Sequence, residues 1–147
     1  MTTLNNILKS ADQIKRATEV GKTVHRRLQH ISTVDGVLVG DETLVARIMS
    51  RPELCCLFDS LSRAEVPVAG TVFGRFVSRR IDRLRIDEAS QTIDILDYKT
   101  DTDKTVFYDK YMAQVREYIE LLKRIYPKYR VRGYILWTHD FELEQVA

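Results

Sequence analysis

The segment RRIDRLRIDEASQTIDILDYK, residues 79–99, constrains this chain more than any other part of its sequence. Apolar and polar residues alternate on both sides of EASQ, which predicts two antiparallel strands joined by a turn, because alternate residues of a strand share a face. With the turn centred between Ala89 and Ser90, apolar residues meet across the hairpin: Leu84 opposite Ile95, and Ile86 opposite Ile93. The same register sets Asp82 opposite Asp97.

Asp82 and Asp97, opposed on a largely apolar face, repel each other, and burial adds to the cost. A divalent cation between them would reverse the sign of this interaction. Lys99 lies two residues beyond Asp97 and on the same face. Carboxylates that hold Mg²⁺ or Mn²⁺, with a lysine that orients the nucleophile or offsets developing charge, suit the hydrolysis of a phosphodiester. An isolated DxK is more often a solvated hairpin end, but the opposed Asp82 argues against that interpretation.

The flanking sequence predicts the class of fold. Before Arg63, apolar residues recur at helical spacing from Leu4 to Ile14 and from Val20 to Ile31, so residues 1–61 are predicted to form a helical N-terminal part. Further helices are expected at about 41–49 and 52–61. Over 62–147, short β-rich runs precede a helix at 111–125 and a last strand, VRGYILW. These elements predict one α/β domain over 1–147, with a central mixed β-sheet flanked by helices.

The helix predicted at 111–125 carries a polar residue on its apolar side. Gln114 lies within the apolar stripe that also contains Tyr118. A glutamine that faces the core needs hydrogen-bond partners, and the edge of an active site supplies them. A backbone edge would satisfy Gln114 as well, and Tyr118 by itself fits an ordinary core position.

Several motifs follow one another along the chain: GKTVHRRLQ from Gly21, AEVPV from Ala64, IDRL and ILDYKT around the two aspartates, QVREY from Gln114, and YPKYRVRGYILWT near the end. This ordered series resembles the RecB-like branch of the PD-(D/E)XK nucleases, and within it the C-terminal nuclease domain of AddA-type helicase-nucleases. The resemblance implies a restriction-endonuclease-like core. Where that family has glycine before the Arg-Ile-Asp element, this chain has Arg79.

The resemblance also implies a metal site. Asp82 and Asp97 would be ligands of Mg²⁺ or Mn²⁺, and the backbone carbonyl of Tyr98 would be a further ligand. His25 occupies the position of a GxxxH motif that often supplies another ligand. Without the family, a lone histidine at the margin of a helical stripe is more often a half-buried structural residue.

Other positions match the family's catalytic motifs. By the resemblance, Lys99 is the catalytic lysine. Gln114 and Tyr118 match a QxxxY motif that is associated with the active site and with DNA. Glu65 matches an acidic position ahead of the core strands, where it would be an accessory residue.

The net charge of +2 does not by itself indicate a nucleic-acid partner. The basic residues are clustered, however, and Arg79, Arg80 and Arg83 surround the first aspartate. Arginines near a metal site can neutralise phosphates without reading bases, so these three are predicted to contact DNA. A solvated face balanced by acids is the alternative interpretation.

Cysteine usage and hydropathy exclude other classes. Cys55 and Cys56 are adjacent and no CxxC pair exists, so neither an iron–sulfur cluster nor a zinc site is expected. No apolar run approaches the ~18 residues that a membrane span needs. We therefore expect a reduced cytoplasmic protein without a membrane partner.

Together these features predict a Mg²⁺- or Mn²⁺-dependent deoxyribonuclease, an exonuclease by its resemblance, that acts in DNA repair or recombination. Because 147 residues cannot hold a helicase motor and no GxxxxGK[ST] loop is present, a helicase subunit is a candidate partner besides DNA. The main alternative is a non-catalytic module that binds DNA or a partner on a nuclease fold. A sequence-specific endonuclease fits less well, because no additional DNA-reading element is evident.

Overall fold

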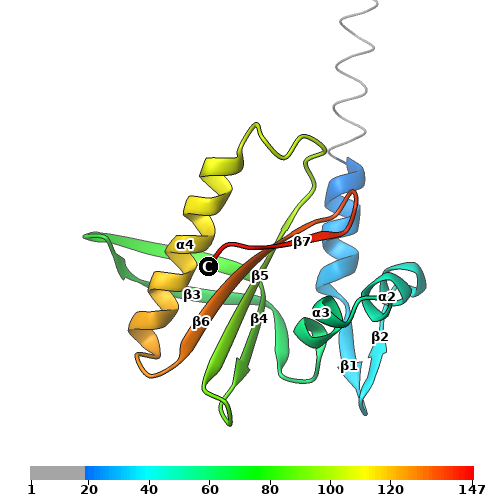
Figure 1. The fold of residues 1–147 in the computed structure, drawn as a ribbon, viewed down its shortest axis with the longest axis horizontal. Helices are drawn as coiled ribbons and strands as arrows, with labels where there is room; N and C mark the ends of the chain where they lie inside the picture. The colour runs from blue at the N-terminus through cyan, green and yellow to red at the C-terminus, as the bar shows by residue number, and fades with distance from the viewer. Residues whose placement is uncertain (1–18) are drawn as a thin grey trace, which may run out of the picture.

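The computed structural model describes residues 19–147, which form an α/β fold around a five-stranded mixed sheet (Figure 1). The strand order is β3-β4-β5-β6-β7; β5 and β6 run parallel, and the other neighbours are antiparallel. After a helix over 19–29, the elements are β1 (Ser32–Val34), β2 (Val37–Val39), α2 (Glu42–Met49), α3 (Pro52–Cys55), the 3₁₀ turn η1 (Cys56–Phe58), β3 (Ser62–Val72), β4 (Arg75–Asp87), β5 (Thr92–Lys99), α4 (Tyr108–Ile125), β6 (Arg130–Trp137) and β7 (Glu142–Gln145). The predicted α/β class with a central mixed sheet is confirmed.

The N-terminal part is less helical than the sequence predicted. The helix expected between Leu4 and Ile14 lies outside the described residues, and residues 32–39 form the two-stranded β1–β2 sheet. Asp35 and Gly36 both have positive φ, 50° and 78°, at the turn of this hairpin. An Asp-Gly pair between β-branched residues favours such a tight hairpin turn over a continuing helix.

The next helix follows its prediction more closely. α2 begins after Asp41, whose side chain accepts a hydrogen bond from the Leu44 N–H and so caps the helix. α3 is shorter than expected: its last turn tightens into η1, and Asp59 is extended. Within residues 19–147, no helix is long and apolar enough to cross a membrane.

The β4–β5 hairpin has the predicted register. Leu84 pairs with Ile95 and Ile86 with Ile93, and the ladder ends at the pair of Arg83 with Leu96. Asp82 and Asp97 occupy the next position in this register. The apolar residues determined the register because a slip of one residue would turn every one of them to the other face.

The side chains of β3 and β4 switch from one face of the sheet to the other at a single position. Ala64 pairs with Arg83 and Val66 with Ile81, but the intervening pair of Glu65 with Asp82 is missing from the ladder. Glu65 has a positive φ of 55°, which is rare for a residue with a side chain. Ile81 and Leu84, three positions apart, consequently lie in the same core cluster, which regular alternation would forbid. The irregularity opens the sheet beside Asp82.

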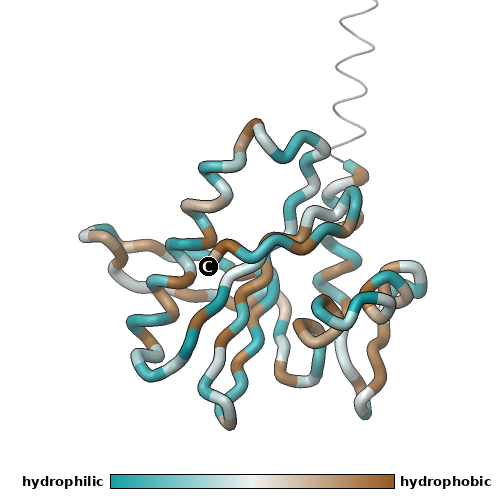
Figure 2. Tube along the Cα trace, viewed as in Figure 1, coloured by the Kyte–Doolittle hydropathy of each residue, from teal (hydrophilic) through white to brown (hydrophobic). Residues whose placement is uncertain are grey.

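Two layers cover the sheet. α4 packs on one face, where its apolar side chains meet those of β5 and β6, whereas the helix over 19–29, α2 and α3 cover the other face (Figure 1). In Figure 2 the hydrophobic stretches follow the sheet strands that lie between these layers. The site described below lies where the first helix and α4 both approach the end of β5.

Close approach of α4 to the sheet depends on Gly133 in β6. A Cβ atom there would lie 2.5 Å from Val115 Cγ1 and 2.8 Å from Ile119 Cδ1. Gly133→Ala should therefore overpack this contact and lower the free energy of unfolding by about 1–3 kcal/mol in urea titration. Val115→Ala, added as a second change, makes room for the new methyl group, so the double variant should lose less stability than the sum of the single variants. Additive losses would contradict this packing.

Candidate active site

Three carboxylates occupy one row across three adjacent strands. Glu65 of β3 and Asp97 of β5 lie on either side of Asp82 of β4, at positions where both ladders lack a pair. The Tyr98 N–H, released from strand pairing with β4, donates a 2.8 Å hydrogen bond to Asp82 Oδ2. Asp82 therefore lies at the centre of an acidic row inside the sheet.

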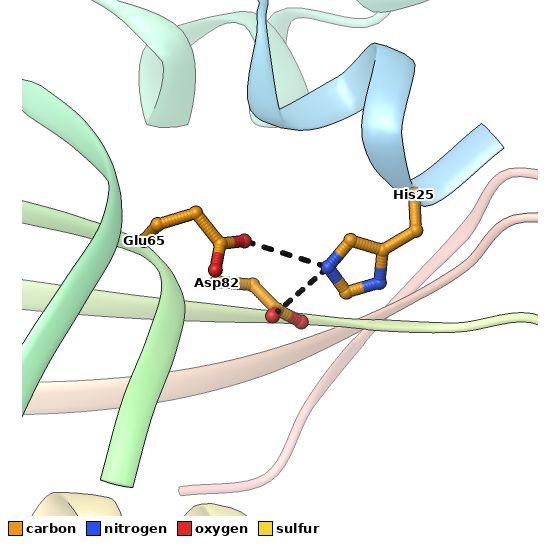
Figure 3. A group of neighbouring side chains, drawn as sticks. All are labelled: His25, Glu65 and Asp82. Carbon is orange, nitrogen blue, oxygen red and sulfur yellow. Dashed lines mark ion pairs between the residues drawn. The ribbon is translucent and has the colours of Figure 1, made fainter. Parts of the chain in front are cut away.

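His25 reaches this row from the helix over 19–29 (Figure 3). Its Nε2 lies 3.3 Å from Asp82 Oδ1 and 3.5 Å from Glu65 Oε1. The helix can approach the sheet here because Gly21 leaves room: a Cβ atom at Gly21 would lie 2.8 Å from Thr100 Oγ1. Hydrogen bonding to Asp82 raises the pKa of His25, although partial burial opposes that shift. The resemblance-based position of His25 thus meets two of the carboxylates.

Two buried carboxylate oxygens in the row have no hydrogen-bond partner among the described residues, Glu65 Oε1 and Asp97 Oδ2. Lys99 Nζ lies 2.9 Å from Asp97 Oδ2, but outside hydrogen-bonding geometry. Burial, followed by repulsion from Asp82, raises the pKa of Asp97 to about 7, while Lys99 acts in the opposite direction. Buried carboxylate oxygens without hydrogen bonds are costly in a folded protein, and a divalent cation would add to the ion pairs that His25 and Lys99 make with these two.

The donor set fits a divalent cation. Ligand atoms of His25, Glu65 and Asp82 all lie within 4.8 Å of one another, and Asp97 approaches Asp82 from β5. Carboxylate oxygens suit Mg²⁺ and Mn²⁺, and an imidazole favours Mn²⁺ of the two. Tyr98 enters the site through its N–H, and its carbonyl as a ligand remains a prediction.

Lys99 is held by a short chain of hydrogen bonds from α4. Its Nζ donates to Gln114 Oε1 at 2.8 Å, and Gln114 Nε2 donates to the Tyr118 hydroxyl at 3.0 Å. The ammonium also lies over the Tyr111 ring, 4.3 Å from its centre. The predicted glutamine on the apolar side of α4 therefore has its partners at the site, and it fixes the direction of Lys99.

Two surface grooves meet at Lys99 and Tyr111. One, of about 560 Å³, runs along the first helix and is lined by His25 and the basic residues Lys22 and Arg26; we call it the helix groove. The other, of about 660 Å³, runs between α4 and the β3–β4 hairpin and is called the hairpin groove. Both are open depressions bordered by cations, a shape that can take an extended anionic chain.

Arg83 is a correction to the predicted DNA contacts. It is 2% exposed and donates to Leu28 O, Ile31 O, Ser62 Oγ and the Tyr98 hydroxyl. A guanidinium whose donors are used inside the protein cannot bind phosphate, so Arg83 ties the first helix to the sheet instead. Arg79 remains partly exposed on the hairpin groove, and Arg80 is exposed on the strand.

Two residues matter more than the sequence indicated. Glu65 was expected only as an accessory acid, yet it lies next to His25 in the group that can hold a cation. Tyr111 was not among the predicted site residues, but its ring faces Lys99, and its hydroxyl donates to Asp101 Oδ2 at 2.8 Å. Its spacing of three residues before Gln114 is the one signal that could have identified it.

Comparison with known proteins adds no assignment: no family model matches this chain, and no curated protein sequence matches it.

The raised pKa of Asp97 gives a test in metal-free protein. In the unfolded chain this carboxyl has a pKa near the usual 3.8, whereas in the fold it is about 7. The folded state therefore holds the extra proton between these values, and the contribution of Asp97 to stability should fall as the pH rises from about 4 to 7. Asp97→Asn removes the buried charge, so in EDTA it should raise the midpoint of thermal unfolding most at pH 8, less at pH 5, and little near pH 4.

The matched control is Asp103→Asn, because Asp103 is exposed in the loop before α4 and its carboxylate serves only its own turn among the described residues. It should not produce the pH-dependent gain. Equal stability of wild type and Asp97→Asn at pH 8 would show that the buried carboxylate carries no electrostatic cost.

Proposed function

We propose that this protein is a metal-dependent deoxyribonuclease with a PD-(D/E)XK core of the RecB-like type. One observation carries the proposal: Asp82, Asp97 and Lys99 lie together on adjacent strands, with the buried Asp97 Oδ2 2.9 Å from Lys99 Nζ. Paired carboxylates with one lysine form the set that metal-assisted phosphodiester hydrolysis requires. The strand register and the resemblance along the chain support the same conclusion independently.

Mg²⁺ or Mn²⁺ would be held by Asp82 and Asp97, with Glu65 and His25 as further ligands. When bound, such an ion polarises a phosphoryl oxygen and makes a water molecule more acidic. Binding relieves the repulsion between the carboxylates, so the energy stored in the metal-free row favours occupancy. The hydrogen bond from the Tyr98 N–H to the Asp82 carboxylate holds that carboxylate in place.

Lys99 supplies the positive charge beside the reacting phosphate. Gln114 and Tyr118 fix the ammonium in one direction, and preorganised charge of this kind needs no rearrangement during the reaction. Lys99 borders both grooves, so a phosphate that passes from one groove to the other comes within its reach. Lys22, Arg26 and Arg79 along the grooves would hold neighbouring phosphates without reading bases.

The resemblance alone adds the biological setting. Exonuclease action, a role in DNA repair or recombination, a helicase subunit as partner and a cytoplasmic location remain predictions. The single-domain organisation over 1–147 is likewise a prediction.

The nuclease proposal is tested with labelled linear DNA, with millimolar Mg²⁺ or Mn²⁺ and with EDTA. Wild type should release nucleotides only with metal. Asp97→Asn and Lys99→Met should each lower the cleavage rate by about 10²–10³-fold or more, because the first weakens a metal ligand and the second removes the positive charge beside the reacting phosphate. The matched controls are Asp103→Asn and Lys128→Met, which change the same charges at exposed positions. Cleavage that survives both site variants would exclude this mechanism.

A non-catalytic DNA-binding module would give a different result. Wild type would then bind DNA but would not cleave it with either metal. Lys99→Met would lower the DNA affinity only by the loss of one phosphate contact. The retained Lys99–Gln114–Tyr118 chain favours the catalytic protein.

His25 should determine which cation is preferred. His25→Asn removes the imidazole from a site that otherwise offers carboxylates. In calorimetric titration this change should weaken Mn²⁺ binding by more than about tenfold, which is the loss expected when an outer-shell partner is removed. It should weaken Mg²⁺ binding less. His30→Asn, in the turn that follows this helix, is the control. An unchanged ratio of the two affinities would show that His25 is not a ligand.

A further inference from the structure

The tip of the β3–β4 hairpin holds a phenylalanine in a costly conformation. The hairpin closes at the pair of Val72 with Arg75, and the two turn residues, Phe73 and Gly74, have positive φ of 53° and 75°. Glycine or asparagine normally occupies such a turn, because a bulky side chain is strained there. The Phe73 ring is 73% exposed, so burial does not offset the strain. Strain of this kind, kept at the surface, indicates a function.

The backbone of the hairpin tip is held against α4, although the Phe73 ring is exposed. Val72 and Val77 are buried against Leu121 of α4, and Arg124 Nη1 donates to Thr71 O at 2.6 Å. Figure 1 shows the hairpin extending past α4 at the left. Phe73 is therefore presented at a fixed position, which lowers the entropy cost of binding a partner.

The two exposed phenylalanines of this hairpin face different sides. Phe73 lines the hairpin groove, at the end away from Lys99. Phe76 is 69% exposed, but it precedes Val77, which points to α4, so its own ring points to the opposite face of the hairpin. Only Phe73 belongs to the groove that leads to the active site.

The charge of the hairpin groove identifies its partner. Arg75 and Arg79 follow Phe73 along β4 toward Asp82, Lys110 lines the same groove from α4, and Glu117 is the acid among its described lining residues. Glu117 pairs with Arg75 at 3.2 Å and with Arg79 at 3.4 Å, which holds the two guanidiniums in place. A line of cations that ends in an exposed aromatic ring complements a nucleic-acid strand, with phosphates on the cations and a base on the ring.

We propose that Phe73 is a base-stacking subsite for an unpaired stretch of DNA, whose phosphates follow Arg75, Arg79 and Lys110 to the active site. This inference rests on the nuclease function proposed above. Stacking requires a base whose face is free, so the subsite acts on single strands and overhangs and leaves paired DNA unaffected.

The length of β4 determines how long a DNA strand must be to reach from the active site to the Phe73 subsite. Between Arg75 and Asp82, β4 advances seven residues, or roughly 23 Å at about 3.3 Å per residue. A stacked strand advances about 3.4 Å per nucleotide, so about seven nucleotides span this distance, and fewer if the strand is extended.

Fluorescence anisotropy with labelled oligodeoxythymidine in EDTA tests the subsite without cleavage. Phe73→Ala should weaken binding of an oligomer of about twenty nucleotides by about 5- to 100-fold, the equivalent of one lost base stack. Phe73→Ala should lower the affinity only for oligomers of about seven nucleotides or longer. A blunt duplex of the same length should bind wild type and Phe73→Ala equally.

Two further variants separate stacking from folding and from general hydrophobicity. Phe73→Gly removes the ring and the strain together, so it should raise the thermal midpoint while it weakens strand binding as much as Phe73→Ala does. Phe76→Ala removes an equally exposed ring on the opposite face and should leave binding unchanged.

The outcomes distinguish this inference from the function on which it rests. Wild type that binds and cleaves DNA, with equal strand affinity in Phe73→Ala, would overturn the stacking subsite alone. An equal loss of strand affinity in Phe76→Ala would also overturn it, because the loss would then follow from general hydrophobicity and not from the groove. Wild type that neither binds nor cleaves DNA would overturn both proposals.

Discussion

Repulsion within one row of carboxylates is the constraint around which this protein is organised. Glu65, Asp82 and Asp97 lie on three neighbouring strands at positions where ladder pairing fails. Like charges at such short separation destabilise a sheet, and burial of Asp97 makes the cost larger. A fold keeps such an arrangement where a cation completes it, since the ion turns the largest local repulsion into attraction.

The surrounding structure holds the row together. Arg83, the neighbour of Asp82, donates to the first helix and to the Tyr98 hydroxyl, so the helix that carries His25 is tied to the strands that carry the acids. Gly21 lets the same helix lie close to the end of β5. From the other face, Gln114 fixes Lys99. His25 and Gln114 thus come from opposite layers and meet the strand residues at one opening in the sheet.

Sequence reasoning succeeded where one periodicity decided the outcome. The alternation around Leu84 and Ile95 determined the β4–β5 register, and with it the opposition of the two aspartates. The β1–β2 hairpin was missed although an Asp-Gly turn was present. Arg83 was wrongly expected to contact DNA, because the sequence does not show that the first helix covers its face of the sheet. The positive φ of Glu65 changes the face of both strands, and no local propensity of glutamate predicts it. Such departures are expected at functional sites, where local preference yields to chemistry.

In the proposed site, a divalent cation completes the row of carboxylates at Asp82. Anomalous X-ray diffraction from a crystal soaked in Mn²⁺ tests this most directly. We expect a manganese peak between the carboxylates of Asp82 and Asp97, at coordination distances of about 2.0–2.6 Å, with Glu65 or His25 as a further ligand. A saturated crystal in which both carboxylates are ordered and manganese lies elsewhere would contradict it.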